Sequence, residues 1–271
     1  MRYRICLLGF LAGCFLAMTQ PVIAEPKSFT FGVVPQQTIR TVARTWLPVT
    51  QYLKRVTGYE FHFATAKNIP AFEKVLSEGG YDFAYMNPYH YTVYSKNPGY
   101  RAFAKARDKK IKGIVVVRKD SNVKKLSDLN NSSLAFPSPL AFAASMLPRA
   151  ILTKQNISFT PHYVNSHDSV YRNVVHDHYQ AGGGVIRTFS AIEKNVQDQL
   201  RILYTTEGFT PHAFAAHPGV PAEAVLKIQQ ALINLEGDAD GEAIFKKLKL
   251  KGFVPALDTD WDDVRALNLS P

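Results

Sequence analysis

Apolar residues recur along this chain in two alternating patterns, one typical of β-strands and the other of α-helices. Residues 28–34 are rich in β-forming side chains and predict a first strand, which ends between Gly32 and Pro35. In the next segment, apolar residues are spaced by 3, 4, 3, 4 and 3 positions and therefore share one face of a helix. These residues are Ile39, Val42, Trp46, Val49, Leu53 and Val56. Pro48 lies among them, so we expect a kink or a second helical segment there.

The alternation of strand and helix patterns continues to the end of the chain. Near-continuous Val and Ile at 111–118 predict a strand that is buried on both faces. This order of elements predicts an α/β fold with mostly parallel sheets and helices on both faces. Further strands are expected at 59–65, 81–86, 133–136, 159–164, 181–186 and 201–205, and helices at 69–77, 88–94, 141–152, 168–178 and from 221, with two short helices after 240.

A polar and charged stretch at 119–130 interrupts the pattern, which then starts again. We therefore expect two lobes joined by two crossovers, near 118–121 and 205–209. The first lobe would consist of residues 25–118 and 206–271, and the second lobe of residues 119–205. In folds of this kind, ligands bind at the carboxyl ends of the strands and in the cleft between the lobes.

Residues 1–24 have the pattern of an export signal. Arg2 and Arg4 precede an apolar run, and the segment ends in Ala24, a small residue suited to signal-peptidase cleavage. The run is shorter than the about 20 apolar residues that a transmembrane helix needs, so we expect the mature chain in the periplasm. A second interpretation stays open, because the four residues up to Cys14 match a bacterial lipobox, which would make Cys14 a lipidated N-terminus.

Charge and cysteine content narrow the chemistry further. The chain has 32 basic and 22 acidic residues, a net charge of +10, which favours anionic partners without choosing among them. Both cysteines, Cys6 and Cys14, lie in the expected signal, so the mature chain offers no disulfide and no Cys-ligated metal. The histidines His162, His176 and His178 lack a visible set of convergent ligands, so we expect neither a metal nor another cofactor.

Lysine clusters at 109–112 and 246–251 are most simply solvated faces. The chain has no recognisable element that reads nucleic acid, so we expect no nucleic-acid partner.

An ordered series of short motifs covers nearly all of residues 28–250. In this combination, the chain resembles the phosphonate/phosphate/phosphite-binding proteins of ABC importers. The resemblance implies a type II periplasmic-binding-protein fold, with two α/β lobes and a small anionic ligand between them. The matching motifs are Gly32-Val33-Val34-Pro35, Trp46-Leu47-Pro48, the segment from Tyr81 to Tyr91, Ser127-Asp128-Leu129, Pro148-Arg149, Asn165-Ser166-His167-Asp168 and Pro211-His212-Ala213-Phe214.

The resemblance also implies which residues line the cleft. Tyr91 falls where the family has a pocket tyrosine, after Asn87 at a strand end, although a tyrosine here fits helix packing equally well. His167 matches a ligand-binding histidine of the family and lies between a strand end and a helix start. We expect Gln36 and Thr38, at the start of the first helix, to contribute from the first lobe.

The chain departs from the family at the loop that holds the phosphorus oxygens. Phosphonate-binding members have a Ser/Thr-rich loop at the start of a second-lobe helix, whereas positions 141–144 here are Ala, Phe, Ala and Ala. The helix start remains, with Ser138 as a candidate N-cap and backbone N–H groups near Ala141 that can face an anion. Alternatively, Ser138 only caps the helix, the alanines pack against the sheet and Phe142 fills the space of the missing hydroxyl groups.

A second departure changes the charge of the site. Members that bind aminoalkylphosphonates place two carboxylates against the substrate ammonium, and the aligned positions here are Arg187 and His212. Guanidinium and imidazole attract an oxyanion, so a zwitterionic aminophosphonate is disfavoured. Arg187 and the following Thr188 lie in the segment that the family uses for its ligand, which favours binding over a surface ion pair.

We therefore expect an extracytoplasmic solute-binding protein of an ABC importer, which captures a small oxyanion such as phosphate, phosphite or a phosphonate by cleft closure. It would act as a monomer and pass its ligand to an ABC permease. As an alternative, the same module docks on the periplasmic domain of a membrane histidine kinase. Catalysis is not expected, because Ser166, His167 and Asp168 are adjacent and a triad needs groups from separate segments. A hydrolase using His167 and Asp168 is the third hypothesis.

Overall fold

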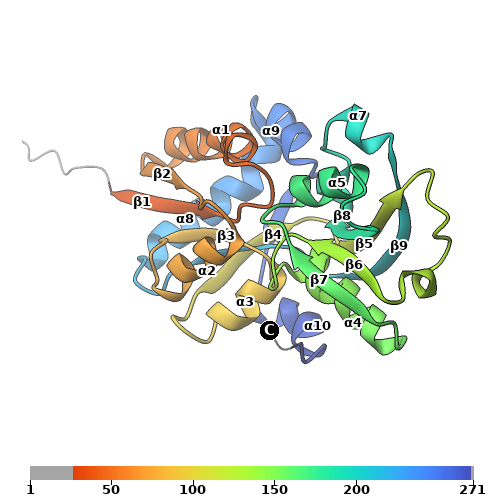
Figure 1. Cartoon of the computed structure of the whole chain (residues 1–271). Coiled ribbons are helices and arrows are strands. Elements are labelled where there is room, and N and C mark those ends of the chain that lie inside the picture. Colours follow the sequence, from red (N-terminus) through yellow and green to blue (C-terminus); the bar gives the residue numbers. More distant parts are fainter. Residues whose placement is uncertain (1–26, 270–271) are drawn as a thin grey trace, which may run out of the picture.

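The computed structural model describes residues 27–269, which form two β-sheets surrounded by helices in the two halves of the molecule (Figure 1). The first sheet has six strands in the order β11-β4-β10-β3-β1-β2. Its strands are β1 (Ser28–Val33), β2 (Glu60–Ala64), β3 (Phe83–Met86), β4 (Arg101–Ala106), β10 (Ala213–Ala216) and β11 (Phe253–Pro255). The helices packed around it are α1 (Ile39–Thr57), α2 (Ile69–Ser77), α3 (Pro88–Tyr94), α8 (Ala222–Asn234) and α9 (Gly241–Leu248).

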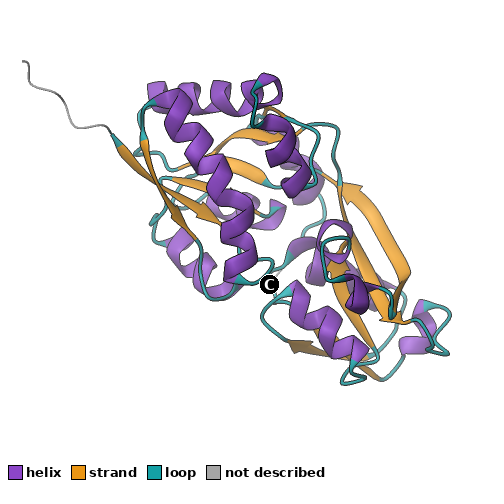
Figure 2. Ribbon diagram, turned by 90° about the horizontal axis from the view of Figure 1, so that it is seen from above, coloured by secondary structure: helices purple, strands orange, loops and turns teal. Residues whose placement is uncertain are grey.

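The second sheet has five strands in the order β7-β6-β8-β5-β9. Helices flank this sheet as well (Figure 2). Its strands are β5 (Ile111–Arg118), β6 (Ser132–Phe136), β7 (Phe159–Tyr163), β8 (Ala181–Val185) and β9 (Leu200–Phe209). Its helices are α4 (Leu147–Lys154), α5 (His167–Val175), α6 (Ile186–Phe189) and α7 (Lys194–Gln197), and a π-helical segment (Phe142–Met146) runs directly into α4.

Helix α1 shows how local sequence sets these elements. The Thr38 side chain accepts a hydrogen bond from the backbone N–H of Thr41, and Gly58 ends the helix in the left-handed conformation, with φ at 72°. The helix continues through Pro48, although the sequence predicted a kink or a new segment there. The buried stripe that includes Trp46 and Leu53 packs against the first sheet on both sides of Pro48, and this packing keeps the helix continuous.

The strand directions differ from the expected mostly parallel sheets. Of the nine strand pairings described, four are parallel, namely β1 with β2 and β3, and β6 with β7 and β8. The other five are antiparallel: β10 with β3 and β4, β11 with β4, and β5 with β8 and β9. Four of these strands, β4, β5, β9 and β10, flank the places where the chain passes between the sheets. β4 leads out of the first sheet and β10 leads back into it, while β5 enters the second sheet and β9 leaves it, so the strands of each pair run in opposite directions.

The first crossover lies earlier than the sequence predicted. β5 pairs with β8 and β9 in the second sheet, although residues up to 118 were expected in the first lobe. The chain therefore changes sheets between β4 and β5, at 107–110, and returns between β9 and β10, at 210–212. The Val and Ile run of β5 indicated burial on both faces, but burial alone does not specify which sheet the strand joins.

The C-terminal segment connects both crossovers. Asp263 accepts hydrogen bonds from the backbone N–H (2.8 Å) and hydroxyl (3.0 Å) of Thr210 and forms an ion pair with Lys110 (3.2 Å). The indole N–H of Trp261 donates to the carbonyl of Pro211 at 2.9 Å. These contacts hold the two connecting segments together beside the cleft.

Candidate ligand-binding cleft

The two lobes contact each other through polar groups across the cleft. The backbone N–H of His167 donates to the Gln36 carbonyl at 3.1 Å, and the Arg187 guanidinium donates to the Gln36 side chain. On another part of the cleft, the Asn87 side-chain amide donates to the Leu140 carbonyl at 3.1 Å. The apolar core of the first lobe also continues across the cleft to the π-helical segment. The structure is thus a closed arrangement of the lobes.

A small central cavity lies between the lobes. It brings together six of the residues that the sequence predicted for the site, along with Val34, Ile69, Ile111, Ala143, Ala144 and Val185. Its volume, measured for the centre of a water-sized sphere, is about 10 Å³, close to the minimum of about 10–15 Å³ for one water molecule. The predicted residues that line it are Gln36, Asn87, Ala141, Phe142, His167 and His212.

The π-helical segment presents backbone donors to this cavity. The N–H groups of Phe142, Ala143 and Ala144 form no hydrogen bond with another described residue, because the first groups of a helix lack intrahelical acceptors. Together with α4, the segment continues to Lys154, so its positive end lies at the cavity. The arrangement provides an anion with backbone N–H groups in place of the missing hydroxyl groups.

Two glycines allow this helix start to lie close to the second sheet. A Cβ atom on Gly113 would lie 2.1 Å from the Ala143 carbonyl oxygen, and one on Gly183 would lie 1.9 Å from that of Ala144. Only glycine fits at both positions, because real Cβ contacts are never this short. Gly113 and Gly183 therefore set the position of the helix start.

The alanines and Phe142 also have the packing role considered above. Phe142 is fully buried and packs edge-on against Phe209 of β9, with ring centroids 5.7 Å apart. Phe142 thus occupies space beside the cavity, and this is one reason why the cavity is small.

Ser138 differs from its predicted role as an N-cap. Its side chain makes no capping hydrogen bond; instead, its carbonyl accepts from Ala141 at 3.3 Å. The buried Ser138 hydroxyl has no partner among the described residues, and Ser138 lines neither the central cavity nor the hinge cavity described below. Likewise, Thr38 caps α1 rather than lining the central cavity, and its backbone faces Asp168 across the cleft.

His167 is held by Thr188 rather than by Asp168. Its Nδ1 lies 3.1 Å from the Thr188 hydroxyl, which also interacts with the Tyr171 hydroxyl (2.8 Å) and the Val185 carbonyl (3.1 Å). Burial, assisted by the positive charge of Arg187, lowers the pKa of His167 to about 3. The imidazole is therefore neutral at pH 7. Thr188 does not line the central cavity; it orients the His167 ring through this hydrogen bond.

His212 lies between the central cavity and a second cavity at the hinge. Burial, and then the charges of Arg187, His90 and His167, lower the pKa of His212 well below its usual value, so this ring is also neutral. Its ring stacks on Tyr85 with centroids 4.9 Å apart, and its Nε2 is buried without a hydrogen-bond partner among the described residues. A buried nitrogen of this kind is costly to leave without a partner.

Tyr85 lines the cleft, whereas Tyr91 does not. Tyr85 ends β3 beside His212 and lines the hinge cavity. Tyr91 is buried against Trp261, and its hydroxyl donates to Asp258 at 2.7 Å, so the predicted pocket role of Tyr91 is wrong. The place of Tyr85 near the carboxyl end of β3 could have indicated it, since ligands bind at the carboxyl ends of strands in folds of this kind.

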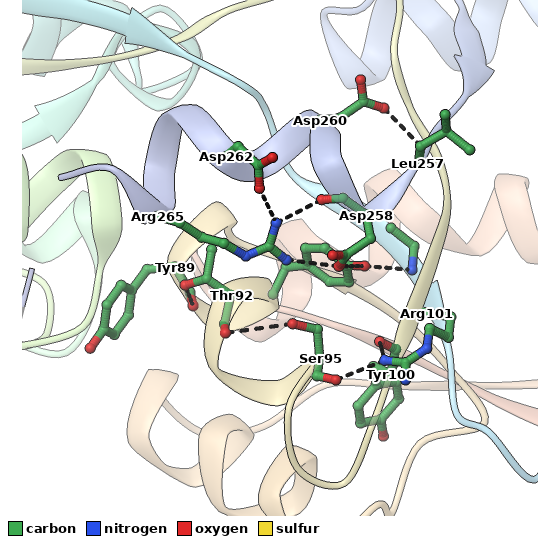
Figure 3. Close-up of polar contacts among 12 residues, drawn as sticks. Tyr89, Thr92, Ser95, Tyr100, Arg101, Leu257, Asp258, Asp260, Asp262 and Arg265 are labelled. Carbon is green, nitrogen blue, oxygen red and sulfur yellow. Dashed lines mark hydrogen bonds and ion pairs between the residues drawn. The ribbon is translucent and has the colours of Figure 1, made fainter. Parts of the chain in front are cut away.

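The segment that covers Tyr91 is held by a local ion-pair cluster. Arg265 lies between Asp258 and Asp262, with 2.7 Å to each, and Asp260 accepts from the backbone N–H of Leu257 (Figure 3). Burial raises the pKa of Tyr91 to about 12, and the Asp258 hydrogen bond adds to this effect. Tyr91 is thus part of the support for the C-terminal segment.

Other kinds of site receive no support within residues 27–269. No group of three or more His, Cys, Asp or Glu side chains in this part of the chain is arranged to hold a metal ion. None of the described helices is both long and apolar enough to cross a membrane. The predicted signal segment and Cys14 lie outside the described residues.

Comparisons with known proteins agree with this geometry. A family model described as "ABC transporter, phosphonate, periplasmic substrate-binding protein" matches residues 31–261. The chain is also 20% identical to the phosphate-import protein PhnD of Mycolicibacterium smegmatis over 284 aligned residues, which cover 89% of this chain and 84% of that protein.

Solved structures with the same arrangement of elements include two binding proteins. The binding protein component of an ABC phosphonate transporter from Pseudomonas aeruginosa has a TM-score of 0.83 at 13% identity, covering 90% of this chain and 86% of that one. PhnD1 of Prochlorococcus marinus, solved in complex with methylphosphonate, has a TM-score of 0.81 at 18% identity, covering 90% and 99%. At these identities the structural similarity shows a shared fold.

Proposed function

This chain belongs to the family of periplasmic substrate-binding proteins of phosphonate ABC transporters, and from this premise we propose that it captures a phosphate- or phosphonate-type oxyanion between its lobes. Its two mixed α/β lobes have the type II periplasmic-binding-protein fold, as in the related structures. In this family the ligand passes to an ABC permease, so transport is the role that the family indicates.

The observation that carries the proposal is the set of unpaired donors around the central cavity. On one side are the free N–H groups of Phe142, Ala143 and Ala144. On the other side is the neutral imidazole of His212, whose Nε2 has no partner among the described residues, beside the neutral ring of His167, whose Nδ1 interacts with Thr188. These groups accept an anion without the cost of burying a counter-ion.

Arg187 supplies the positive charge for this site. It lowers the pKa of both His167 and His212, so its field reaches the cavity between them. Among the described residues it forms no ion pair with a carboxylate, and its partner is the neutral amide of Gln36. An arginine without a carboxylate partner favours an oxyanion over the ammonium group of an aminophosphonate.

Binding and closure are linked through the walls of the cavity. A phosphonate head needs more room than about 10 Å³, so we expect the lobes to separate slightly around the ligand. The contacts of Gln36 with His167 and Arg187 join the lobes beside the cavity. A ligand that bridges both lobes then stabilises the closed form over the open one, which is the state that a permease can distinguish.

The test is a calorimetric titration of the purified protein with phosphate, phosphite and methylphosphonate. Intrinsic fluorescence provides a second readout, because Trp46 contacts Tyr85 with ring centroids 4.4 Å apart and Tyr85 stacks on His212. We expect at least one of these oxyanions to bind, with a change in fluorescence, and 2-aminoethylphosphonate to bind more weakly. Absence of binding by all of them would contradict the proposal.

We also propose that the ligand is released unchanged. His167 interacts with Thr188, and the buried Asp168 is raised in pKa mainly by desolvation, so the two do not form a charge-relay pair. Phosphorus NMR of a phosphonate or phosphate ester incubated with the protein should show no product. Product formation that disappears in His167→Ala would support the hydrolase hypothesis instead.

Export, monomeric state and sensing stay predictions of the sequence. We propose cleavage after Ala24, since the family is periplasmic and the segment resembles an export signal. The intact mass of the exported protein distinguishes this from a lipid on Cys14, and light scattering measures whether it is a monomer.

Loss of phosphonate uptake in a strain without the permease separates transport from docking on a sensor kinase.

A further inference from the structure

The hinge cavity, which adjoins the central cavity, is larger and more basic. Its volume, measured in the same way, is about 100 Å³, enough for several water molecules. It lies between the first crossover, the end of β8 and the residues Pro211–His212, and it shares Ile111, Val185 and His212 with the central cavity. If the lobes separate slightly around a ligand, as expected above, a substituent on the head in the central cavity can extend past these residues into the hinge cavity.

The charge of the hinge cavity is almost wholly uncompensated. Four basic residues line it, Lys109, Lys110, Lys112 and Arg187, and no Asp or Glu is among its lining residues. Of these four residues, only Lys110 forms an ion pair within the described part of the chain, with Asp263 at 3.2 Å. The three lysines are exposed, as the sequence predicted, whereas Arg187 is half-buried. Arg187 therefore supplies the charge that is least screened by solvent in this cavity.

His212 indicates a ligand group at the wall that the two cavities share. Its side chain forms part of the wall between the two cavities, and its Nε2 is buried without a partner among the described residues. Stacking on Tyr85 fixes the plane of the ring, so the Nε2 position is set by the fold. An anionic oxygen on either side of this wall satisfies the nitrogen when it carries the proton.

We propose that the ligand carries a second anionic group, a carboxylate on a short linker, which binds in the hinge cavity between Arg187 and the lysines. The substrate class is then the short ω-phosphonocarboxylates, with the phosphonate at the N–H groups of Phe142–Ala144. This assignment rests on the proposed function, since it needs the phosphonate head in the central cavity. A guanidinium pairs with a carboxylate through two parallel hydrogen bonds, and the lysines add charge that is screened by salt.

The test compares ligands that differ only at the far end of the linker. Phosphonoacetate and 3-phosphonopropionate are titrated beside ethylphosphonate and propylphosphonate, with 2-aminoethylphosphonate as the oppositely charged ligand. We expect the phosphonocarboxylates to bind at least tenfold more tightly than the alkylphosphonates, and this ratio to fall as salt is added.

A double variant assigns the preference to this cavity. Lys109→Gln with Lys112→Gln should lower the ratio several-fold without abolishing it, because Arg187 still pairs with the carboxylate, and the loss should be larger for the phosphonocarboxylates than for ethylphosphonate. The matched control is Lys124→Gln with Lys125→Gln, which changes two exposed lysines that line neither cavity. The control should keep the ratio of the unchanged protein.

The outcomes separate this inference from the proposed function. If alkylphosphonates or phosphate bind and the carboxylate gives no advantage, the second anionic subsite is wrong and the proposed function stands. A preference that is undiminished in the double variant also overturns the assignment to the hinge cavity. If no oxyanion binds at all, the proposed function fails and the inference fails with it.

Discussion

The two cavities of the cleft share a wall but differ in size and charge. The central cavity, of about 10 Å³, is surrounded by apolar side chains, neutral imidazoles and backbone N–H groups. The hinge cavity, of about 100 Å³, is lined by four basic side chains. On the proposed function, the oxyanion would be recognised in the central cavity, while most of the positive charge would come from the hinge cavity. Two residues connect these parts. His212 lines both cavities, and Arg187 lines the hinge cavity while its charge lowers the pKa of His212.

The largest effect is expected from Phe142→Ala, which acts on the central cavity alone. Removing a fully buried aromatic ring that packs on Phe209 should lower the free energy of unfolding by about 3–5 kcal/mol. Urea unfolding followed by circular dichroism measures this loss. A change below about 1 kcal/mol would mean that the ring is not part of the core.

Gly183→Ala should move the backbone donors of the central cavity without touching the hinge cavity. Because the added Cβ would meet the Ala144 carbonyl at 1.9 Å, the helix start has to shift. We expect a loss of about 1–3 kcal/mol in stability, together with weaker oxyanion binding by calorimetry.

The matched control for this glycine is Gly237→Ala, where a Cβ meets nothing within 4 Å. The control should keep both stability and affinity. Equal behaviour of the two variants would show that the close approach of sheet and helix is unimportant for the site.

Arg187→Gln removes the charge that both cavities share. We expect the affinity for phosphate or methylphosphonate to fall about tenfold or more, which corresponds to about 1.4 kcal/mol or more. Calorimetry of the variant measures this, with Arg172→Gln as the control, since Arg172 is engaged in a surface ion pair with Glu193 at 2.7 Å. An unchanged affinity would remove Arg187 from the site.

The smallest effect concerns pH and the neutral histidines. The pKa of His167 is about 3 in the folded protein, against an ordinary value of 6.5, so the unfolded state binds more protons between these values. Stability should therefore be complete above pH 6.5 and should decline as the pH falls from 6.5 toward 3. Thermal unfolding between pH 7 and 5 should show a smaller decline in His167→Asn. The same decline in both proteins would contradict a buried neutral imidazole.

Much of the fold follows from the sequence because burial leaves a periodic pattern. The stripe of α1 and the Val and Ile run of β5 predicted their elements well. The short strands β4, β10 and β11 were missed, because small residues and mixed polarity give them no clear alternation. The periodicity of β5 also carried no information on which sheet it joins, so the first crossover was misplaced.

The candidate site was predictable only where an element's end fixes a side chain. His167 and Asn87 lie at the starts of helices that follow strands, and the structure brings both to the central cavity. The family resemblance assigns Tyr91 to the pocket, and the sequence does not reveal the C-terminal segment that covers this residue. The basic hinge cavity depends on contacts between 109–112 and 185–187, which are distant in the chain.

The most direct test of the account is an amide NMR titration of the ¹⁵N-labelled protein with methylphosphonate. If the oxyanion binds at the free N–H groups of the π-helical segment, the resonances of Phe142, Ala143 and Ala144 should show the largest downfield shifts in the spectrum, because hydrogen bonds to an anion deshield amide protons. If methylphosphonate binds and these three resonances stay in place while others move, the ligand lies elsewhere and the central claim is wrong.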